Sequence, residues 1–198
     1  LKAWRDYGSG VISRDQLMGP AIKLAREGFD LSIYEAERFN KNKERLSKHS
    51  ETKRIFTRDD REWKKDDIFK QTDLANTLER IAKNGRDGFY KGETAKLIVE
   101  EMKSVGGWID YEDLENYVSK YRQPVKGSFL GYEIISMGPP SSGGLLVVHM
   151  LNMLEHYPLD SIGWNSSDYV HVLTEVERRA YADRAIHMGD PDFWKVPV

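Results

Sequence analysis

Apolar residues recur at helical spacing along most of the chain, and one short region alternates like a β-strand. Ser13 and Gln16 have the spacing of a capping box, and apolar residues follow at intervals of three and four until Gly28. The pattern predicts a helix over residues 14–27. From Leu31 apolar residues continue between many charged ones, which predicts a second, largely exposed helix that ends in a polar stretch.

Three further helices are predicted in the middle of the chain. The first begins with an acidic residue, carries a late lysine and ends at Gly85. The second follows Gly92 and ends at two consecutive glycines, and Asp110 is expected to cap a short third helix. Residues 1–122 are therefore predicted to be helical.

The periodicity then changes from helical to alternating. Two short runs of β-branched and aromatic residues between Val125 and Ser136 are divided by Leu130-Gly131, which predicts a β-hairpin within residues 123–137. Residues 138–198 are predicted to form a loop and two long helices. The predicted fold class is α+β, a predominantly helical fragment with one hairpin.

The loop Gly138-Pro139-Pro140-Ser141-Ser142-Gly143-Gly144 is the most unusual segment of the sequence. It leads into an apolar helix predicted from Leu145 to Tyr157. Asn165-Ser166-Ser167 is expected to cap the final helix, which ends before Gly189.

Composition and charge exclude several classes of protein. The 198 residues include 39% hydrophobic and 31% charged residues, which is a globular composition, and the net charge of -2 gives no global attraction to nucleic acid. The absence of cysteine excludes disulfides and thiolate chemistry within the chain. The longest apolar run, Leu145–Val148, is far shorter than the roughly 18 residues of a membrane span. We predict no membrane span and no nucleic-acid partner.

One region departs from this charge balance. Residues 38–65 contain 11 Lys and Arg residues against 5 Asp and Glu residues. This excess permits two interpretations, an electrostatic binding patch or a solvated helix face with its loop. The interspersed acidic residues favour the solvated face.

The serines of the Pro-Gly-rich loop do not match a known nucleophile motif. Neither serine has glycines at both two-residue offsets, and position 144 is glycine where a P-loop requires lysine. Two hypotheses are left: a tight turn that packs the following helix, which we favour, or a loop whose small residues and backbone N–H groups line a substrate cleft. The residues for the second hypothesis are Ser141, Ser142, Gly143 and Gly144.

The histidines and the C-terminal aspartates give no strong site. His149 and His156 lie two helical turns apart, wider than the spacing with which two imidazoles reach one zinc ion, so we expect no metal and no cofactor. His171 and His187 are interpreted as surface or interface side chains. Asp190 and Asp192 could pair as acid and base, but acids beside a proline at a helix end favour a turn.

Several short strings in the chain resemble one family closely. Their order and spacing are similar to those of the γ-glutamyltranspeptidases along nearly the whole chain. The strings are Pro20-Ala21-Ile22-Lys23-Leu24-Ala25-Arg26-Glu27-Gly28-Phe29, Asp73-Leu74-Ala75-Asn76-Thr77-Leu78, Gly88-Phe89-Tyr90-Lys91-Gly92, Gly107-Trp108-Ile109, Gly131-Tyr132-Glu133-Ile134, Pro139-Pro140-Ser141-Ser142-Gly143-Gly144, Ala180-Tyr181-Ala182-Asp183-Arg184 and Gly189-Asp190-Pro191-Asp192-Phe193.

The resemblance implies an N-terminal nucleophile hydrolase with an αββα fold, made as a zymogen that cuts itself into a large and a small subunit. It implies that the new N-terminal threonine of the small subunit attacks a γ-glutamyl amide such as glutathione, with its own α-amine as base. Residues 1–198 correspond to the later part of the large subunit, so we carry over no catalytic residue. The implied partners are the small catalytic subunit and the remainder of the large subunit.

Three alternatives stay open from the sequence. The chain could be the helical lobe of such an enzyme, inactive alone, or an interaction module that kept the fold but lost the enzyme. It could also belong to a relative that cleaves acylated β-lactams or poly-γ-glutamate. The chain begins at Leu1 without a signal peptide and reads as an excised piece. The resemblance implies a periplasmic or extracellular parent, and we expect an isolated chain to self-associate through exposed apolar surface.

Overall fold

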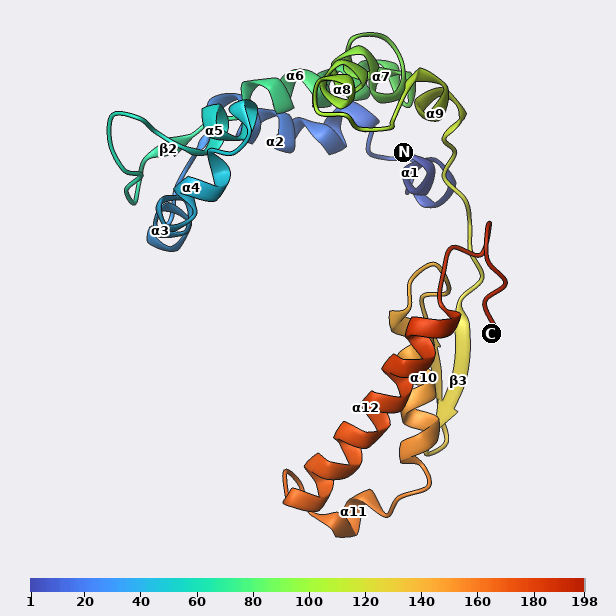
Figure 1. Cartoon of the computed structure of the whole chain (residues 1–198). Helices are drawn as coiled ribbons and strands as arrows, with labels where there is room; N and C mark the ends of the chain where they lie inside the picture. The colour runs from blue at the N-terminus through green and yellow to red at the C-terminus, as the bar shows by residue number, and fades with distance from the viewer. Residues whose placement is uncertain (198) are drawn as a thin grey trace. The chain divides into compact units, whose positions relative to one another are not determined.

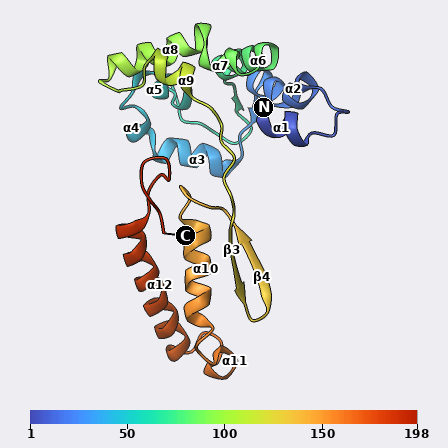
Figure 2. The same cartoon turned by 90° about the vertical axis from the view of Figure 1, so that its right-hand side faces the viewer.

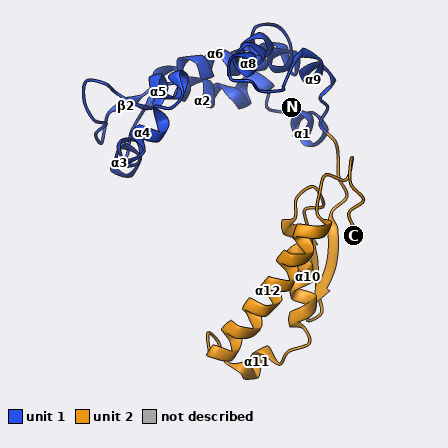
Figure 3. Cartoon of the chain, in the orientation of Figure 1, with its two compact units in different colours: residues 1–119 blue, residues 120–198 orange. Residues whose placement is uncertain are grey.

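The structure, a computed structural model, describes residues 1–197 and divides the chain into two compact units. Unit 1 covers residues 1–119 and unit 2 begins at Lys120 (Figure 3). Unit 1 is helical apart from one pair of two-residue strands, and unit 2 combines a hairpin with helices (Figure 1). The predicted class, a predominantly helical α+β fragment with a hairpin, is confirmed.

The elements of unit 1 follow one another in short segments. They are α1 (Lys2–Tyr7), α2 (Arg14–Glu27), β1 (Phe29–Asp30), α3 (Ile33–Lys41), α4 (Lys43–Leu46), α5 (Ser50–Phe56), β2 (Ile68–Phe69), α6 (Thr72–Asn84), α7 (Asp87–Tyr90), α8 (Gly92–Ser104) and α9 (Tyr111–Asn116). Unit 2 contains β3 (Val125–Phe129), β4 (Tyr132–Ser136), α10 (Gly143–Leu154), α11 (Leu159–Ile162) and α12 (Ser167–His187).

The strongest sequence signals are found where they were expected. Helix α2 covers residues 14–27, and the capping box between Ser13 and Gln16 is formed in both directions. Helix α6 ends at Gly85, and Asp110 caps α9 with hydrogen bonds accepted from two backbone N–H groups. These boundaries depend on contacts within one turn, which is why local sequence predicts them.

The second predicted helix is wrong as one element. The chain forms α3, breaks at Asn42, forms α4 and then forms α5, which lies in the polar stretch where the predicted helix was expected to end. The Asn42 side chain donates a hydrogen bond to the carbonyl oxygen of Arg38, four residues earlier. Such a local bond competes with continued helix, which accounts for the break.

These short helices are organised by an aromatic cluster that the periodicity did not reveal. Phe39, Phe56, Trp63 and Phe69 lie with neighbouring ring centroids 5.3–6.1 Å apart, mostly in edge-to-face or tilted arrangements. Trp63 and Phe69 are buried together with Leu31. The four aromatic residues come from three elements and a loop, so only the tertiary fold brings them together.

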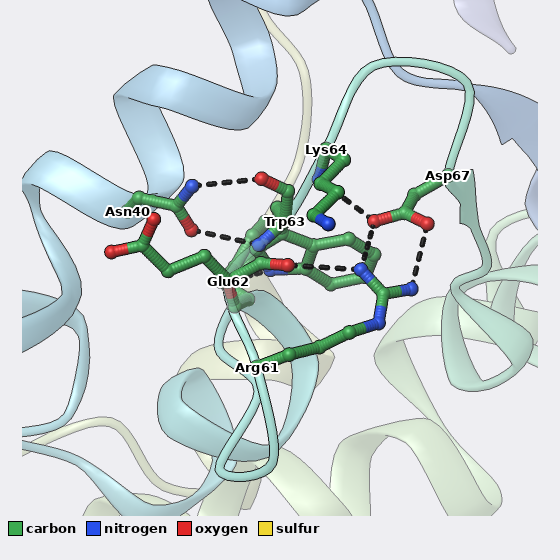
Figure 4. Close-up of polar contacts among 7 residues, drawn as sticks. Asn40, Arg61, Glu62, Trp63, Lys64 and Asp67 are labelled. Carbon is green, nitrogen blue, oxygen red and sulfur yellow. Dashed lines mark hydrogen bonds and ion pairs between the residues drawn. The ribbon is translucent and has the colours of Figure 1, made fainter.

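Side-chain hydrogen bonds fix the loop that carries Trp63 (Figure 4). The Asn40 amide donates to the Trp63 carbonyl oxygen at 2.8 Å and accepts from the Trp63 N–H at 2.9 Å (Figure 4). Arg61 binds both carboxylate oxygens of Asp67, at 2.6 and 2.7 Å, and Asp67 also accepts from the N–H of Lys64 (Figure 4). These bonds hold the pKa of Asp67 well below its usual range.

Two arginines of unit 1 satisfy backbone carbonyls at helix ends. Arg14 donates to the carbonyl oxygens of Ala82 and Lys83 at the end of α6. Arg86 donates to three carbonyl oxygens in and after α9, including that of Tyr117 at 2.7 Å. The last carbonyls of a helix lack partners within the helix, so these contacts tie consecutive helices together.

Unit 2 is built on the predicted hairpin. Strands β3 and β4 form an antiparallel hairpin (Figure 2). Phe129 lies opposite Tyr132, and the turn residues Leu130 and Gly131 both have positive φ. One face of the hairpin packs on α10, because a Cβ atom on Gly127 would lie 2.5 Å from a methyl carbon of Val148. Helix α12 covers α10, with Val176 and Ala180 buried.

None of the helices in the described part of the chain combines the length and apolar content that a bilayer crossing requires.

The aromatic cluster predicts a large effect for a single truncation. Phe69→Ala should lower the free energy of unfolding by about 3–5 kcal/mol, because Phe69 is only 4% exposed and contacts four other rings. Urea unfolding followed by circular dichroism measures this change. The matched control is Phe193→Ala, since that ring is 90% exposed and should change stability by less than about 0.5 kcal/mol. Equal effects of the two variants would contradict the assignment of the cluster as a core.

Candidate functional site

The Pro-Gly-rich loop connects the end of β4 to the first turn of α10. Ser142 is the residue before the helix, and its carbonyl oxygen accepts the N–H of Leu146 at 2.9 Å. The Ser142 hydroxyl does not cap the helix; instead it accepts a hydrogen bond from the Arg184 guanidinium of α12 at 3.0 Å. The loop is therefore tied to both helices of unit 2, and α10 has no side-chain cap.

The two glycines that open α10 have different surroundings. Gly144 is buried, and a Cβ atom there would lie 2.2 Å from the carbonyl oxygen of Met137. Gly143 is exposed, and its nearest neighbour, the Ser141 hydroxyl, would be 3.8 Å from an added Cβ. Close approach at Gly144 thus serves packing within the chain, as the turn hypothesis requires. At Gly143 the backbone is open to a partner.

A groove of about 370 Å³ lies between α10 and α12. Its polar lining is contributed by His149 and Asn152 from α10 and by Asp183, Arg184 and His187 from α12. The His149 Nδ1 atom lies 3.7 Å from an Asp183 carboxylate oxygen. Asp183 was not predicted as the partner of His149, because the two residues are 34 positions apart in the sequence.

The other histidines stay apart from this pair. His156 and His171 are exposed. His187 is also exposed, although its backbone carbonyl accepts the indole N–H of Trp194. Within residues 1–197, His, Asp and Glu side chains nowhere gather in the groups of three that would hold a metal ion.

Asp190 and Asp192 form a turn that is held by two cations from the start of unit 2. The Asp190 carboxylate accepts the N–H of Asp192 at 3.0 Å. Asp192 accepts two hydrogen bonds from Arg122, both at 2.8 Å, and one from Lys120 at 2.7 Å. These cations hold the pKa of Asp192 well below its usual range, so it stays ionised at neutral pH. An acid and base pair would need one carboxyl group with a raised pKa.

The chemistry that these residues can perform is binding rather than catalysis. In the described residues, the hydrogen-bond partner of the Ser142 hydroxyl is a guanidinium, which cannot accept its proton, and no base is bonded to Ser141. Arg184 and Arg122 were not predicted as partners of this region. Neither Arg184 in α12 nor Arg122 in the segment before β3 carries a local signal of a contact 42 or 70 positions away.

The contrast between the two glycines can be tested directly. Gly144→Ala should destabilise unit 2 by at least about 1–3 kcal/mol, because the new methyl group meets a backbone oxygen that cannot rotate away. Gly143→Ala is the matched control: it meets no close atom and should be neutral or slightly stabilising, since alanine favours helix by up to about 1 kcal/mol. Thermal unfolding followed by circular dichroism compares them. Equal stability of both variants would show that the close approach at Gly144 does not exist in solution.

The contacts of Asp192 predict a pH dependence. Its pKa is depressed in the folded chain, so its stabilising contribution is complete above its ordinary pKa of 3.8 and is lost as pH falls through the lower folded value. In Asp192→Asn this acid-side loss should be smaller, and stability at neutral pH should fall. Urea unfolding of both proteins from neutral pH down to about pH 3 measures the difference. Parallel pH curves would refute the interaction.

The comparisons with known proteins agree with the resemblance. The family model described as gamma-glutamyltranspeptidase matches residues 1–198. The chain is 42% identical over 196 residues to the glutathione hydrolase proenzyme of Escherichia coli (strain K12). This match covers 95% of this chain and 33% of that protein. It is 36% identical over 200 residues to the Acylase ACY 1 proenzyme of Pseudomonas sp. (strain SE83), covering 100% of this chain and 36% of the acylase.

A solved structure gives the same result. The chain superimposes on the gamma-glutamyltranspeptidase of Helicobacter pylori with a TM-score of 0.92 and 43% identity, covering 99% of this chain and 56% of that chain. The chain spans about a third of the length of the curated relatives that it matches. The family model covers the whole chain, and the fold agrees with it. The chain therefore belongs to the γ-glutamyltranspeptidase family.

Proposed function

We propose that this chain is a segment of the large subunit of an autoprocessed γ-glutamyltranspeptidase. The parent enzyme would hydrolyse or transfer the γ-glutamyl group of glutathione and related γ-glutamyl amides. The nucleophile would be the N-terminal threonine of a small subunit outside this chain, with its α-amine as base. The observation that carries the proposal is a family match over all 198 residues of a chain that spans only about a third of its curated relatives.

The role of this segment in the parent would be structural. In the described residues, the Ser142 hydroxyl accepts a hydrogen bond from Arg184, and Asp183 lies beside His149. These contacts fix the positions of two helices and leave no activated nucleophile. The chain would thus supply the helical lobe of an αββα fold and need other segments for chemistry.

The loop itself supports a narrower proposal. Residues 141–144 would line the substrate cleft of the parent, with the exposed backbone at Gly143 as the point of contact. Two observations support this: the space next to Gly143 is open, and the first N–H groups of α10 have no side-chain cap. Such N–H groups suit a carboxylate or an oxyanion. At Gly144 only the internal packing role has support.

The apolar side chains of unit 2 support a proposal about partners. The side chains of Val147, Val170, Tyr181 and Ile186 on α10 and α12 are exposed. In the parent these surfaces would contact the small subunit and the remainder of the large subunit, and in an isolated chain they would promote self-association. A periplasmic or extracellular location of the parent, which the resemblance implies, is part of the same proposal. No cofactor is needed for it.

In a second candidate function, the parent enzyme would act on a different substrate by the same mechanism. The match to an acylase proenzyme covers the whole chain at 36% identity, only slightly below the match to the glutathione hydrolase of Escherichia coli. The parent could therefore act as an acylase. The nucleophile would still come from outside this chain.

The proposal predicts that activity requires the missing segments. The isolated chain should not release product from a chromogenic γ-glutamyl anilide, because the proposed threonine nucleophile lies outside it. The same chain within its complete, autoprocessed precursor should be active, and replacing the first threonine of the small subunit by alanine should abolish both processing and activity. Product release by the isolated chain would refute the proposal. A precursor that processes itself but prefers an acyl β-lactam would select the acylase.

A further inference from the structure

The basic region of unit 1 contains two kinds of cation. Lys53 pairs with Asp59, Arg54 with Glu51 and Asp73, and Arg61 with Asp67. In contrast, Lys41, Arg45 and Lys48 form no ion pair within residues 1–197, and Arg38 donates only to the Tyr34 hydroxyl group. Ion pairs with carboxylates therefore engage three cations of the second half of the basic region, Lys53, Arg54 and Arg61.

Packing explains why these four cations face solvent. The inner side of α3 packs through Ala36 and Phe39 on the cluster that contains the buried Leu31. Lys43, the remaining cation of this segment, donates to the backbone carbonyl of Arg58. Arg38, Lys41, Arg45 and Lys48 are exposed in consequence. Of the acids nearby, Glu35 is engaged with Ser32, whereas Glu37 and Glu44 are exposed and reduce the local charge.

Two large apolar side chains are exposed at the start of the same segment. Ile33 is 60% exposed and Tyr34 is 65% exposed, immediately before the first of the four cations. An exposed aliphatic and an amphipathic aromatic side chain beside several unpaired cations is the combination that favours binding at a lipid headgroup layer. A single-stranded nucleic acid would need several aromatic platforms, and Tyr34 is the one aromatic residue on this exposed face.

We propose that residues 33–48 form a docking surface for an anionic phospholipid bilayer. The cations Arg38, Lys41, Arg45 and Lys48 would bind the headgroup phosphates, and Ile33 and Tyr34 would enter the headgroup layer. Binding would be peripheral and reversible, since four cations and two apolar side chains contribute far less binding free energy than a membrane-spanning helix. This surface is independent of the proposed γ-glutamyl chemistry, so failure of either proposal leaves the other standing.

Vesicle co-sedimentation of the chain tests the proposal. The chain should bind vesicles of phosphatidylcholine mixed with phosphatidylglycerol and should not bind vesicles of phosphatidylcholine alone. Binding should weaken as salt rises, because the Debye length falls from about 10 Å at 0.1 M to about 3 Å at 1 M. The double variant K41A/R45A should lower the partition coefficient about 25-fold, since each basic residue near an anionic surface contributes about fivefold.

Two further variants separate this surface from general electrostatic attraction. K83A/K103A removes the same charge from exposed positions on α6 and α8 and should reduce binding much less than K41A/R45A. I33A/Y34A should weaken binding several-fold without changing the number of salt-dependent contacts. Circular dichroism should show unchanged helix content, because all these side chains are exposed or only partly buried. Equal binding to neutral vesicles, equal loss in K83A/K103A, or tight binding only to soluble polyphosphate would each overturn the proposal.

Discussion

Unit 2 depends on the close approach of a two-stranded hairpin to one helix. A hairpin alone is at best marginally stable in water, so β3 and β4 need an apolar surface to cover one face. Helix α10 provides it, and the missing side chain of Gly127 is what lets Val148 reach the strand. The missing side chain of Gly144 likewise admits the carbonyl of Met137 at the first turn. Larger residues at these two positions would separate the hairpin from the helix.

Arginine side chains join neighbouring segments of the chain through hydrogen bonds to polar groups. Arg14 and Arg86 satisfy carbonyl oxygens at helix ends in unit 1, and Arg184 and Arg122 hold the loop and the C-terminal turn of unit 2. A guanidinium group offers five donors in a planar fork, so one side chain can bridge two segments. These guanidinium groups therefore hold the framework of the two units. This framework role agrees with a family whose members are made as longer proenzymes.

In the basic region, a count of charges along the sequence does not identify the ion pairs that form in the structure. The excess of cations in residues 38–65 is visible in the sequence, and the interspersed acids there favoured a solvated face. The fold pairs Glu51 and Asp59 with cations that follow α4, whereas within residues 1–197 Lys41, Arg45 and Lys48 have no carboxylate partner. Which cation an acid neutralises depends on distances of a few ångströms, and a count along the chain does not contain them.

The sequence by itself determined the helices with caps, the hairpin with its Leu130-Gly131 turn, and the family. Each of these follows from contacts within a few residues or from the order of short strings, which the chain carries without folding. The tertiary structure alone decided the aromatic cluster around Trp63 and the roles of Gly143 and Gly144 in the candidate loop. The physical reason is that a packing distance belongs to a pair of segments. Met137 and Gly144 are close in sequence, yet only the path of the chain between β4 and α10 makes glycine necessary at one position and not at its neighbour.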